Sequence, residues 1–408
     1  MGDRKILLID TWTKGINHFV PFIDEFLRVG YQIEFIHINS INSISLDTSL
    51  RKDIKYVDVS YDNQEYVREL FESSTVDLIL FLSVNSLFLE SLNLLARERG
   101  IKTVHIYHGL NSLVNWEYLM KEQQRIDVIT LALKFWKNLK ILKVVINFKP
   151  AGTTSASVLK RVCKSLLGRL LNYSPHGTKE PIHHTDFGIV YCKEDAHHMH
   201  LSYGVNKSKI FIRGFPDLTS IDTGSKNVAC TKDIVYISTA LTDENLLFKS
   251  EKEYADYIIK INHELSSKAY RMLVKLKPHG KLSNSREFLQ KLKENSIPYF
   301  HQEFETKYFN DCAFVLTEPS TYSIIPMYMK AKVGLVCVKP LSKDIYGEFL
   351  TSYPSSFFYE SILDWDDVDK ELQANLTEDW YRERFSLSDK PDLAKLALNI
   401  TREIHGRL

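Results

Sequence analysis

The segment "KLKPHGK" (residues 275–281) places a histidine and a glycine directly after an apolar run. An imidazole can donate a hydrogen bond to a phosphate oxygen, and a glycine lets the backbone approach the same group closely. Lys277 adds a positive charge two residues before His279. We therefore predict that Lys277, His279 and Gly280 contact the phosphate of a ligand. The alternative is a histidine in an ordinary surface turn.

A second polar segment, "LTEPSTYS" (316–323), follows another apolar run and precedes the apolar sequence "IIPMYMKA". Hydroxyl groups and free backbone N–H groups at the start of a helix bind anions, and a neighbouring carboxylate can hold ribose hydroxyls. This pattern predicts that Glu318, Ser320, Thr321 and Ser323 bind a nucleotide. The alternative is that the serines only cap the helix.

A third segment, "STALTDEN" (238–245), carries two adjacent carboxylates, Asp243 and Glu244. A carboxylate at the end of a strand can act as a general base or as a nucleophile. We predict a catalytic role for this pair, with helix capping as the alternative. In the first half of the chain, His108, Asn111 and Glu117 are the polar residues predicted to face the acceptor.

These residues can form one site only if the strands that precede them end at the same edge of a sheet. The sequence pattern predicts such sheets. Short β-branched runs alternate with helical patterns such as 18–30 and 86–100, an arrangement typical of parallel sheets covered on both faces. The predicted strands are residues 5–10, 33–38, 77–83, 102–109, 187–192, 209–214, 233–239, 272–280, 297–301, 312–319, 332–338 and 356–360. Ligands of such sheets bind at the carboxyl ends of the strands, where all three segments lie.

The length of 408 residues exceeds what one ordinary core supports and predicts two domains. Residues 214–233 are polar and rich in turn formers, so we place the linker there. The predicted domains are 1–215 on the acceptor side and 216–387 on the nucleotide side. Residues 388–408 are predicted to form a helix that packs back on the first domain.

The composition excludes several classes of protein. Lys and Arg number 52 against 51 Asp and Glu, which argues against binding nucleic acid through overall charge. The five cysteines are far apart and form no CxxC motif, so neither a disulfide framework nor a zinc site is indicated. No apolar stretch is long enough to span a membrane. We therefore expect a cytoplasmic protein.

The two Rossmann-like halves, with a "KPH" turn and then a "TEPST" turn in the second half, resemble the GT-B glycosyltransferases. The likeness is greatest to bacterial transferases that use CMP-activated sialic acid or Kdo in capsule and lipopolysaccharide synthesis. It implies that His279 contacts the CMP phosphate and that Ser320 and Thr321 bind the same phosphate. Gly280 stands where those families have proline, and Thr321 where they have a second serine.

The resemblance further implies two parallel sheets facing a central cleft and transfer of an ulosonic acid, Kdo or sialic acid, to a surface glycan. It also implies a catalytic carboxylate, for which Asp243 is chosen by position, and no cofactor or metal beyond the CMP-sugar donor. Base and nucleophile stay open as its role. The alternatives are a UDP- or CDP-dependent transferase or epimerase, and a non-catalytic protein that binds nucleotide or glycan.

Residues 134–149 lie in a stretch that contains lysines and arginines but no acids between Asp127 and Glu180. At helical spacing, lysines at 134, 137, 140 and 143 surround an apolar face. Such a helix can lie on an anionic membrane surface, which predicts peripheral association with the inner face of the cytoplasmic membrane. The alternatives are a helix packed on the first domain and a direct grip on an anionic glycan.

Overall fold

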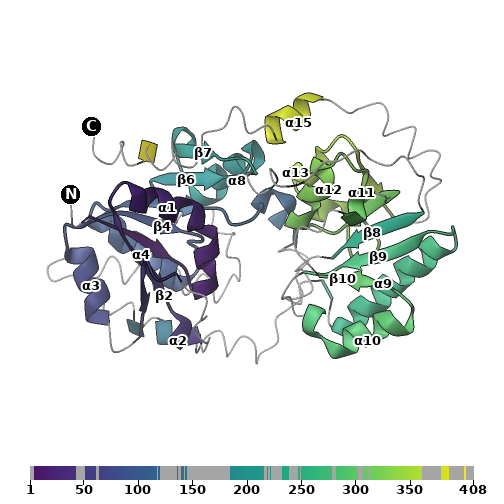
Figure 1. The fold of residues 1–408 in the computed structure, drawn as a ribbon, viewed down its shortest axis with the longest axis horizontal. Coiled ribbons are helices and arrows are strands. Elements are labelled where there is room, and N and C mark those ends of the chain that lie inside the picture. The colour runs from purple at the N-terminus through teal and green to yellow at the C-terminus, as the bar shows by residue number, and fades with distance from the viewer. Residues whose placement is uncertain are drawn as a thin grey trace. The chain divides into compact units, whose positions relative to one another are not determined.

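The structure is a computed structural model, and it divides into two compact units. The first comprises residues 1–109, 126–213 and 389–408, and the second comprises residues 110–125 and 214–388. The residues described are 4–42, 51–60, 64–116, 118–119, 136, 139–141, 143–144, 184–215, 218, 221, 232–238, 247–248, 250–277, 282–301, 307–310, 312–360, 378–385 and 399–400. Figure 1 shows each unit as a sheet with helices packed against it.

The first unit is built on a seven-stranded sheet in the order β3-β2-β1-β4-β5-β6-β7. Every neighbouring pair is parallel. The strands are β1 (Lys5–Ile9), β2 (Gln32–His37), β3 (Lys55–Asp58), β4 (Val76–Phe81), β5 (Lys102–Ile106), β6 (Phe187–Val190) and β7 (Ile210–Ile212). The helical segments are η1 (Thr13–His18), α1 (Val20–Arg28), α2 (Asn39–Asn42), α3 (Gln64–Glu72), α4 (Leu87–Glu98), α8 (Lys193–Tyr203) and η3 (Lys207–Lys209).

The core of the first unit forms because alternate strand residues point to the same face of the sheet. Ile6 and Leu8 of β1 pack in one cluster with the phenylalanines of α1, which recur at helical spacing. Ile400 belongs to the same cluster, although the chain passes through the second unit before it reaches this residue. The opposite face of β1 is also buried, at Leu7 and Ile9. Burial on both faces explains why the strands read as continuous apolar runs.

The second unit has a six-stranded sheet in the order β10-β9-β8-β11-β12-β13, again with every pair parallel. Its strands are β8 (Asp233–Ile237), β9 (Arg271–Lys275), β10 (Tyr299–Phe300), β11 (Phe314–Thr317), β12 (Val333–Val336) and β13 (Ser356–Tyr359). Its helical segments are η2 (Asn111–Leu113), α9 (Glu251–Ser266), η5 (Leu282–Asn284), α10 (Arg286–Glu294), α11 (Lys307–Asn310), η6 (Thr321–Ser323), α12 (Ile324–Tyr328), η7 (Lys343–Ile345), α13 (Glu348–Thr351) and α15 (Glu378–Phe385).

Both sheets reverse their strand order once, between β1 and β4 in the first unit and between β8 and β11 in the second. In sheets of this kind the loops on either side of the reversal diverge, and ligands bind in the crevice that this leaves. The predicted α/β class with two parallel-sheet units is therefore confirmed. The facing of the two sheets across a cleft stays a prediction.

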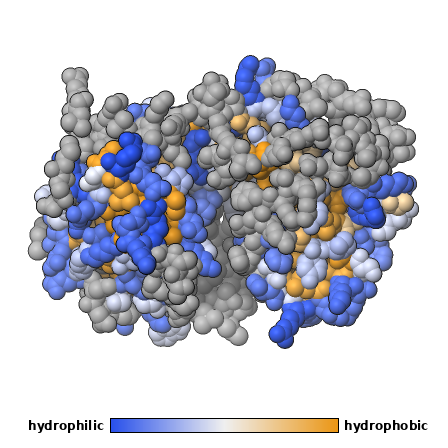
Figure 2. All heavy atoms as spheres, in the orientation of Figure 1, coloured by the Kyte–Doolittle hydropathy of each residue, from blue (hydrophilic) through white to orange (hydrophobic). Residues whose placement is uncertain are grey.

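Polar residues cover much of the described surface. Figure 2 shows hydrophilic residues on the visible faces of both units, with apolar residues appearing between them. Trp12, Trp136 and Leu201 are among the large apolar side chains that remain exposed. Within the described ranges, no helix combines the length and apolar character needed to cross a membrane.

Candidate functional site

The carboxyl edge of the second sheet carries the predicted nucleotide-binding segments. Lys277 is exposed two residues after β9, and Ser320 to Ser323 follow β11. Asp243, Glu244, His279 and Gly280, and also Glu117 of the acceptor side, lie outside the described residues. Because β9, β8 and β11 are adjacent in this order, the segments that follow them leave the sheet side by side at the reversal point.

Glu318, the first residue after β11, is a buried carboxylate held by tyrosines. The hydroxyls of Tyr236 on β8 and Tyr254 on α9 each donate a hydrogen bond of 2.6 Å to its Oε1. Burial and the nearby Glu318 raise the pKa of Tyr236 well above its ordinary value, so its hydroxyl remains a donor. These bonds fix the start of the loop that carries Ser320. A contact of Glu318 with ribose stays a prediction.

The loop after β11 is closed by its own hydroxyl groups. Ser320 caps η6, and its Oγ accepts a hydrogen bond of 3.3 Å from the backbone N–H of Tyr322. The hydroxyl of Ser323, which is buried, donates to the carbonyl of Ser320. Thr321 is exposed on this turn. The bonds of Ser320 and Ser323 therefore shape the turn, and Thr321 presents its side chain at the surface.

Lys275, the last residue of β9, ties the three strand ends together. Its side chain is buried, and its Nζ lies 4.3 Å from the centre of the Tyr322 ring in η6. Its carbonyl accepts a hydrogen bond of 3.0 Å from the hydroxyl of Ser238, which follows β8. The sequence gives no direct sign that Lys275 is buried, because a lysine inside a basic run is usually exposed. The feature of the sequence that could have indicated its burial is its position at the end of an apolar strand.

In the first unit, His108 follows β5 and contacts a residue from the β1 side of the sheet. The rings of His18 and His108 have centroids 5.5 Å apart. His18 has an accessible surface, yet the protein around it excludes enough water to lower its pKa to about 4, with further lowering by His108 and Arg213. His18 is therefore neutral near pH 7. His18 was not predicted as a site residue, because it lies in η1 and does not directly follow an apolar run.

Asp10 directly follows β1 at the reversal point of the first sheet and is 6% exposed. Burial raises its pKa to about 7, while hydrogen bonds from the Thr11 backbone and the Trp12 side chain oppose the rise. Gly15 packs on the carboxyl group so closely that a Cβ at this position would lie 2.0 Å from Oδ2. The turn from β1 into η1 therefore holds a carboxyl group that is only partly ionised at neutral pH.

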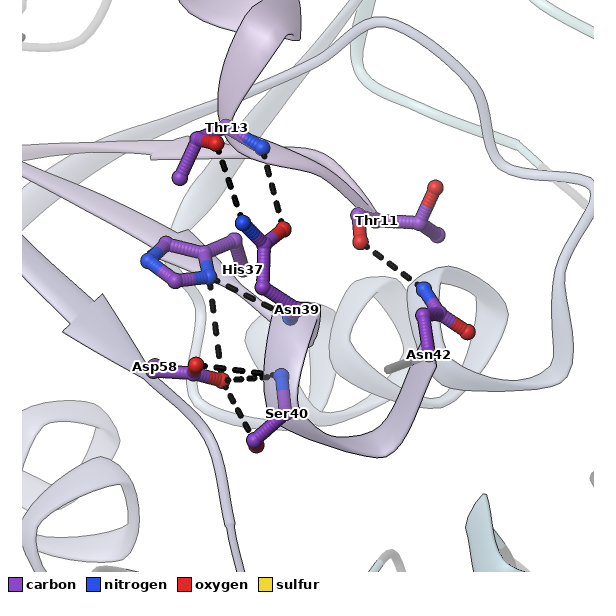
Figure 3. A network of polar contacts seen from close by, with 7 residues as sticks. All are labelled: Thr11, Thr13, His37, Asn39, Ser40, Asn42 and Asp58. Atoms are coloured by element: carbon purple, nitrogen blue, oxygen red, sulfur yellow. Dashed lines mark hydrogen bonds and ion pairs between the residues drawn. The ribbon is translucent and has the colours of Figure 1, made fainter. Parts of the chain in front are cut away.

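A polar network, buried at Thr13 and Asn39, fixes this turn against the segment that follows β2 (Figure 3). Asn39, after β2, accepts a hydrogen bond of 3.1 Å from the backbone N–H of Thr13 and donates one of 3.0 Å to its hydroxyl. Asn42 donates a hydrogen bond of 3.0 Å to the carbonyl of Thr11. Ser40 in turn donates from its hydroxyl to Asp58 at 2.9 Å. The loops after β1, β2 and β3 are thus joined, and η1 begins at a fixed point.

Asn111, predicted on the acceptor side together with His108, lies in a segment that groups with the second unit. Val114 forms an antiparallel bridge with Tyr346, and the N–H of Asn115 donates to the carbonyl of Ile345 at 2.8 Å. The carbonyl of Asn111 accepts a hydrogen bond of 3.2 Å from the Trp116 indole. Asn111 and His108 are therefore positioned by different units.

Only part of the predicted basic helix at 134–149 falls within the described residues. Ile141 and Val144 are buried there, whereas Trp136, Lys140 and Lys143 are exposed. The described residues thus have a buried side at Ile141 and Val144 and an exposed side that carries Trp136 as well as two lysines. The membrane-binding role of this segment stays a prediction. Among the residues that the structure describes, no cluster of three or more His, Cys, Asp or Glu side chains is suited to hold a metal ion.

Comparison with known proteins gives no family assignment. No protein-family model and no curated protein matches the chain. The solved structures with a similar fold include Os79 from O. sativa in complex with U2F and trichothecene, at 10% identity and a TM-score of 0.48, covering 98% of this chain and 100% of that one.

Two further structures have a similar degree of likeness. UDP-N-acetylglucosamine 2-epimerase from Rickettsia bellii has 13% identity and a TM-score of 0.45, covering 99% of this chain and 97% of its own. The wall teichoic acid polymerase TagF has 12% identity and a TM-score of 0.46, covering 99% of this chain and 89% of its own.

Proposed function

We propose that the protein is a glycosyltransferase that binds a nucleotide-activated sugar at the carboxyl edge of its second sheet. One observation carries the proposal: the ends of β8, β9 and β11 are adjacent at the reversal point and are joined through Lys275. A nucleotide needs a phosphate site and a ribose site close together, and sheets of this order bind nucleotides at this place.

For the donor we propose a CMP-activated ulosonic acid, Kdo or sialic acid, on the strength of the "KPHG" and "EPST" segments. His279, Ser320 and Thr321 would contact the phosphate, with Lys277 and Gly280 beside them and Glu318 and Ser323 shaping the turn. The anomeric carbon of such a donor carries its own carboxylate, and loss of CMP builds up positive charge at that carbon. The enzyme then has to stabilise the departing phosphate and deprotonate the acceptor.

Asp243 is the proposed base or nucleophile, and Glu244 is its neighbour in the same segment. His108, Asn111 and Glu117 are proposed to contact the acceptor glycan. The exposed Lys140 and Lys143 support a further proposal, that the protein associates through residues 134–149 with an anionic membrane surface that carries the acceptor.

The test of the donor compares the melting temperature of the protein with CMP, UDP, CDP and GDP, because a ligand that binds the folded state raises it. We expect CMP to give the largest rise. His279→Ala should weaken CMP binding about ten- to a hundredfold, as the loss of a charge-assisted hydrogen bond predicts. His301→Ala is the matched control, since His301 is exposed at the end of the neighbouring β10.

Selective stabilisation by UDP or CDP would overturn the CMP donor in favour of the alternative transferase or epimerase. Stabilisation by no nucleotide would overturn the proposed function. Asp243→Asn should lower turnover by about 10²- to 10⁴-fold while CMP still binds, and Glu244→Gln is its comparison. CMP binding without turnover of any CMP-sugar would indicate a non-catalytic binding protein.

A further inference from the structure

Arg213 is a buried cation at the carboxyl edge of the first sheet. It follows β7 directly and is 7% exposed. Its guanidinium stacks over the Tyr191 ring at 4.3 Å and donates one hydrogen bond, from Nη2 to the Tyr191 hydroxyl. Its Nε is buried and has no hydrogen-bond partner among the described residues.

A guanidinium withdrawn from water normally pairs with an anion, because an isolated buried charge costs several kcal/mol. The Tyr191 hydroxyl is neutral and supplies only one acceptor. Two buried acids of the first unit, Glu194 and Asp195, lie in the first turn of α8, where the helix dipole favours negative charge. The hydrogen bond of Arg213 goes to Tyr191 rather than to either of these acids. Its buried Nε has no hydrogen-bond partner among the described residues.

Two histidines lie on the same carboxyl edge of the first sheet, one after β1 and one after β5. Arg213 is close enough to His18 to contribute to the lowering of its pKa, and the His18 ring is 5.5 Å from that of His108. The Nδ1 of His108 donates to the carbonyl of Leu82 at 3.2 Å, which orients its ring. Asp10, the carboxyl group on the same edge, has a pKa raised to about 7 by burial and so carries only part of a negative charge at neutral pH. These side chains come from the segments that follow β1, β5 and β7 at the carboxyl edge of the sheet.

We propose that Arg213, with His18 and His108 beside it, binds an oxyanion of the acceptor at the carboxyl edge of the first sheet. The anion is a carboxylate or a phosphate group, which a guanidinium binds through two parallel hydrogen bonds. The acceptor is then an acidic glycan or a phosphate-linked glycan rather than a neutral sugar. This inference rests on the proposed function only in assigning the anion to the acceptor.

The experiment measures the melting temperature of the full chain against inorganic phosphate and, separately, against D-glucuronate. CMP is present at saturation, which keeps the proposed donor site filled. We expect at least one anion to raise the melting temperature of the parent by about 2–4 °C. Arg213→Gln should abolish that rise, whereas Lys207→Gln should keep it. Lys207 is the matched control because it is an exposed cation just before the same strand.

The two anions distinguish a phosphate site from a carboxylate site. Retention of the anion-induced rise by Arg213→Gln, or no rise with either anion in the parent, overturns the proposal. Without added anion, Arg213→Gln should melt at or above the parent temperature, because it removes an uncompensated buried charge. A marked lowering of that temperature, with the anion effect intact, makes Arg213 a structural residue.

Should Arg213→Gln fail to fold, Arg213→Lys decides the question. It keeps the charge but not the planar pair of donors, so we expect anion affinity to fall about tenfold. Unchanged affinity would overturn the proposal. CMP binding is recorded for every variant. If CMP binds to no variant and not to the parent, the donor proposal is refuted. The oxyanion-site proposal is then still decided by whether the anion effect depends on Arg213.

Discussion

At the scale of single residues, burial decides which charges this protein carries. Asp10 lies under Gly15 at the end of β1, and its pKa of about 7 means that the folded state holds a proton that the unfolded chain releases near pH 4. Lys275 and Arg213, in contrast, are buried cations. Both sheets therefore end in charges that the fold has withdrawn from water.

We predict that Asp10 makes the folded protein less stable as pH rises. Between about pH 4 and pH 7 the folded state binds one more proton than the unfolded state, so the free energy of unfolding falls with pH. The stabilisation is complete below the unfolded pKa and is lost above the folded one, and it amounts to something on the order of 4 kcal/mol. Asp10→Asn should remove this slope. Denaturant unfolding at several pH values measures it.

Glu98→Gln is the control, because Glu98 is an exposed acid at the end of α4. It should leave the pH dependence of the parent unchanged. An equal slope in the parent and in Asp10→Asn would show that Asp10 is ionised in the folded protein at neutral pH.

The sequence predicted which residues follow the strands of the two sheets. It did not predict which other side chains those residues contact. Glu318 was expected after a strand, and it is there, since an apolar run marks a buried strand. Its partners Tyr236 and Tyr254 are distant in sequence and come to it only through the pairing of β8 with β11 and the packing of α9. Arg213 was not among the predicted site residues, because nothing in the sequence near it shows that it becomes buried.

At the scale of elements, the run of residues 111–115 is held by the segment that precedes α13. The N–H of Gly347 donates to the carbonyl of Leu113 at 2.8 Å. A Cβ at Gly347 would lie 2.1 Å from the backbone oxygen of Ser112, so only glycine allows this approach. The position of Asn111 therefore depends on a residue far along the chain.

Gly347→Ala should push these two segments apart and cost about 1–3 kcal/mol, as overpacking usually does. Hydrogen exchange of the backbone amides in residues 111–116 should become faster, while exchange in β1 stays unchanged. Glu348→Ala, at an exposed position one residue on, is the control. Equal exchange in Gly347→Ala and the parent would show that the segment is held by other contacts.

Strands were the most predictable elements, since apolar β-branched runs identify every strand within the described residues except β3. That strand, Lys55–Asp58, lies at the sheet edge and has only one buried residue, Val57, so it lacks the apolar run. The predicted strands also extend past the observed carboxyl ends, as with 102–109 against Lys102–Ile106. Tyr107 is buried although it lies outside β5, so the apolar run extends beyond the last residue that pairs with a neighbouring strand.

At the scale of the whole molecule, each unit contains a segment that is remote in sequence. Residues 389–408 group with the first unit, and Ile400 is 2% exposed in its core. The sequence indicated a helix there through its apolar spacing. The apolar surface that this segment covers depends on the path of the chain through the second unit. A local sequence pattern does not predict that path.

Ile400→Ala should destabilise the first unit by about 2–5 kcal/mol, the usual cost of removing a buried branched side chain. Hydrogen exchange should then become faster in β1 and β2, while β8 and β9 keep their protection. Ile400→Val, which removes one methylene group, should show a much smaller effect. Equal acceleration in β8 would mean that the two units unfold as one cooperative block.

The path of the chain also sets an order of events during synthesis on the ribosome. The chain passes between the units at four points, after residues 109, 125, 213 and 388. The first unit emerges before the second, but its core stays open at the position of Ile400 until translation has passed through the entire second unit. A nascent chain would therefore complete the second unit while the first still exposes apolar surface, the condition in which chaperones bind.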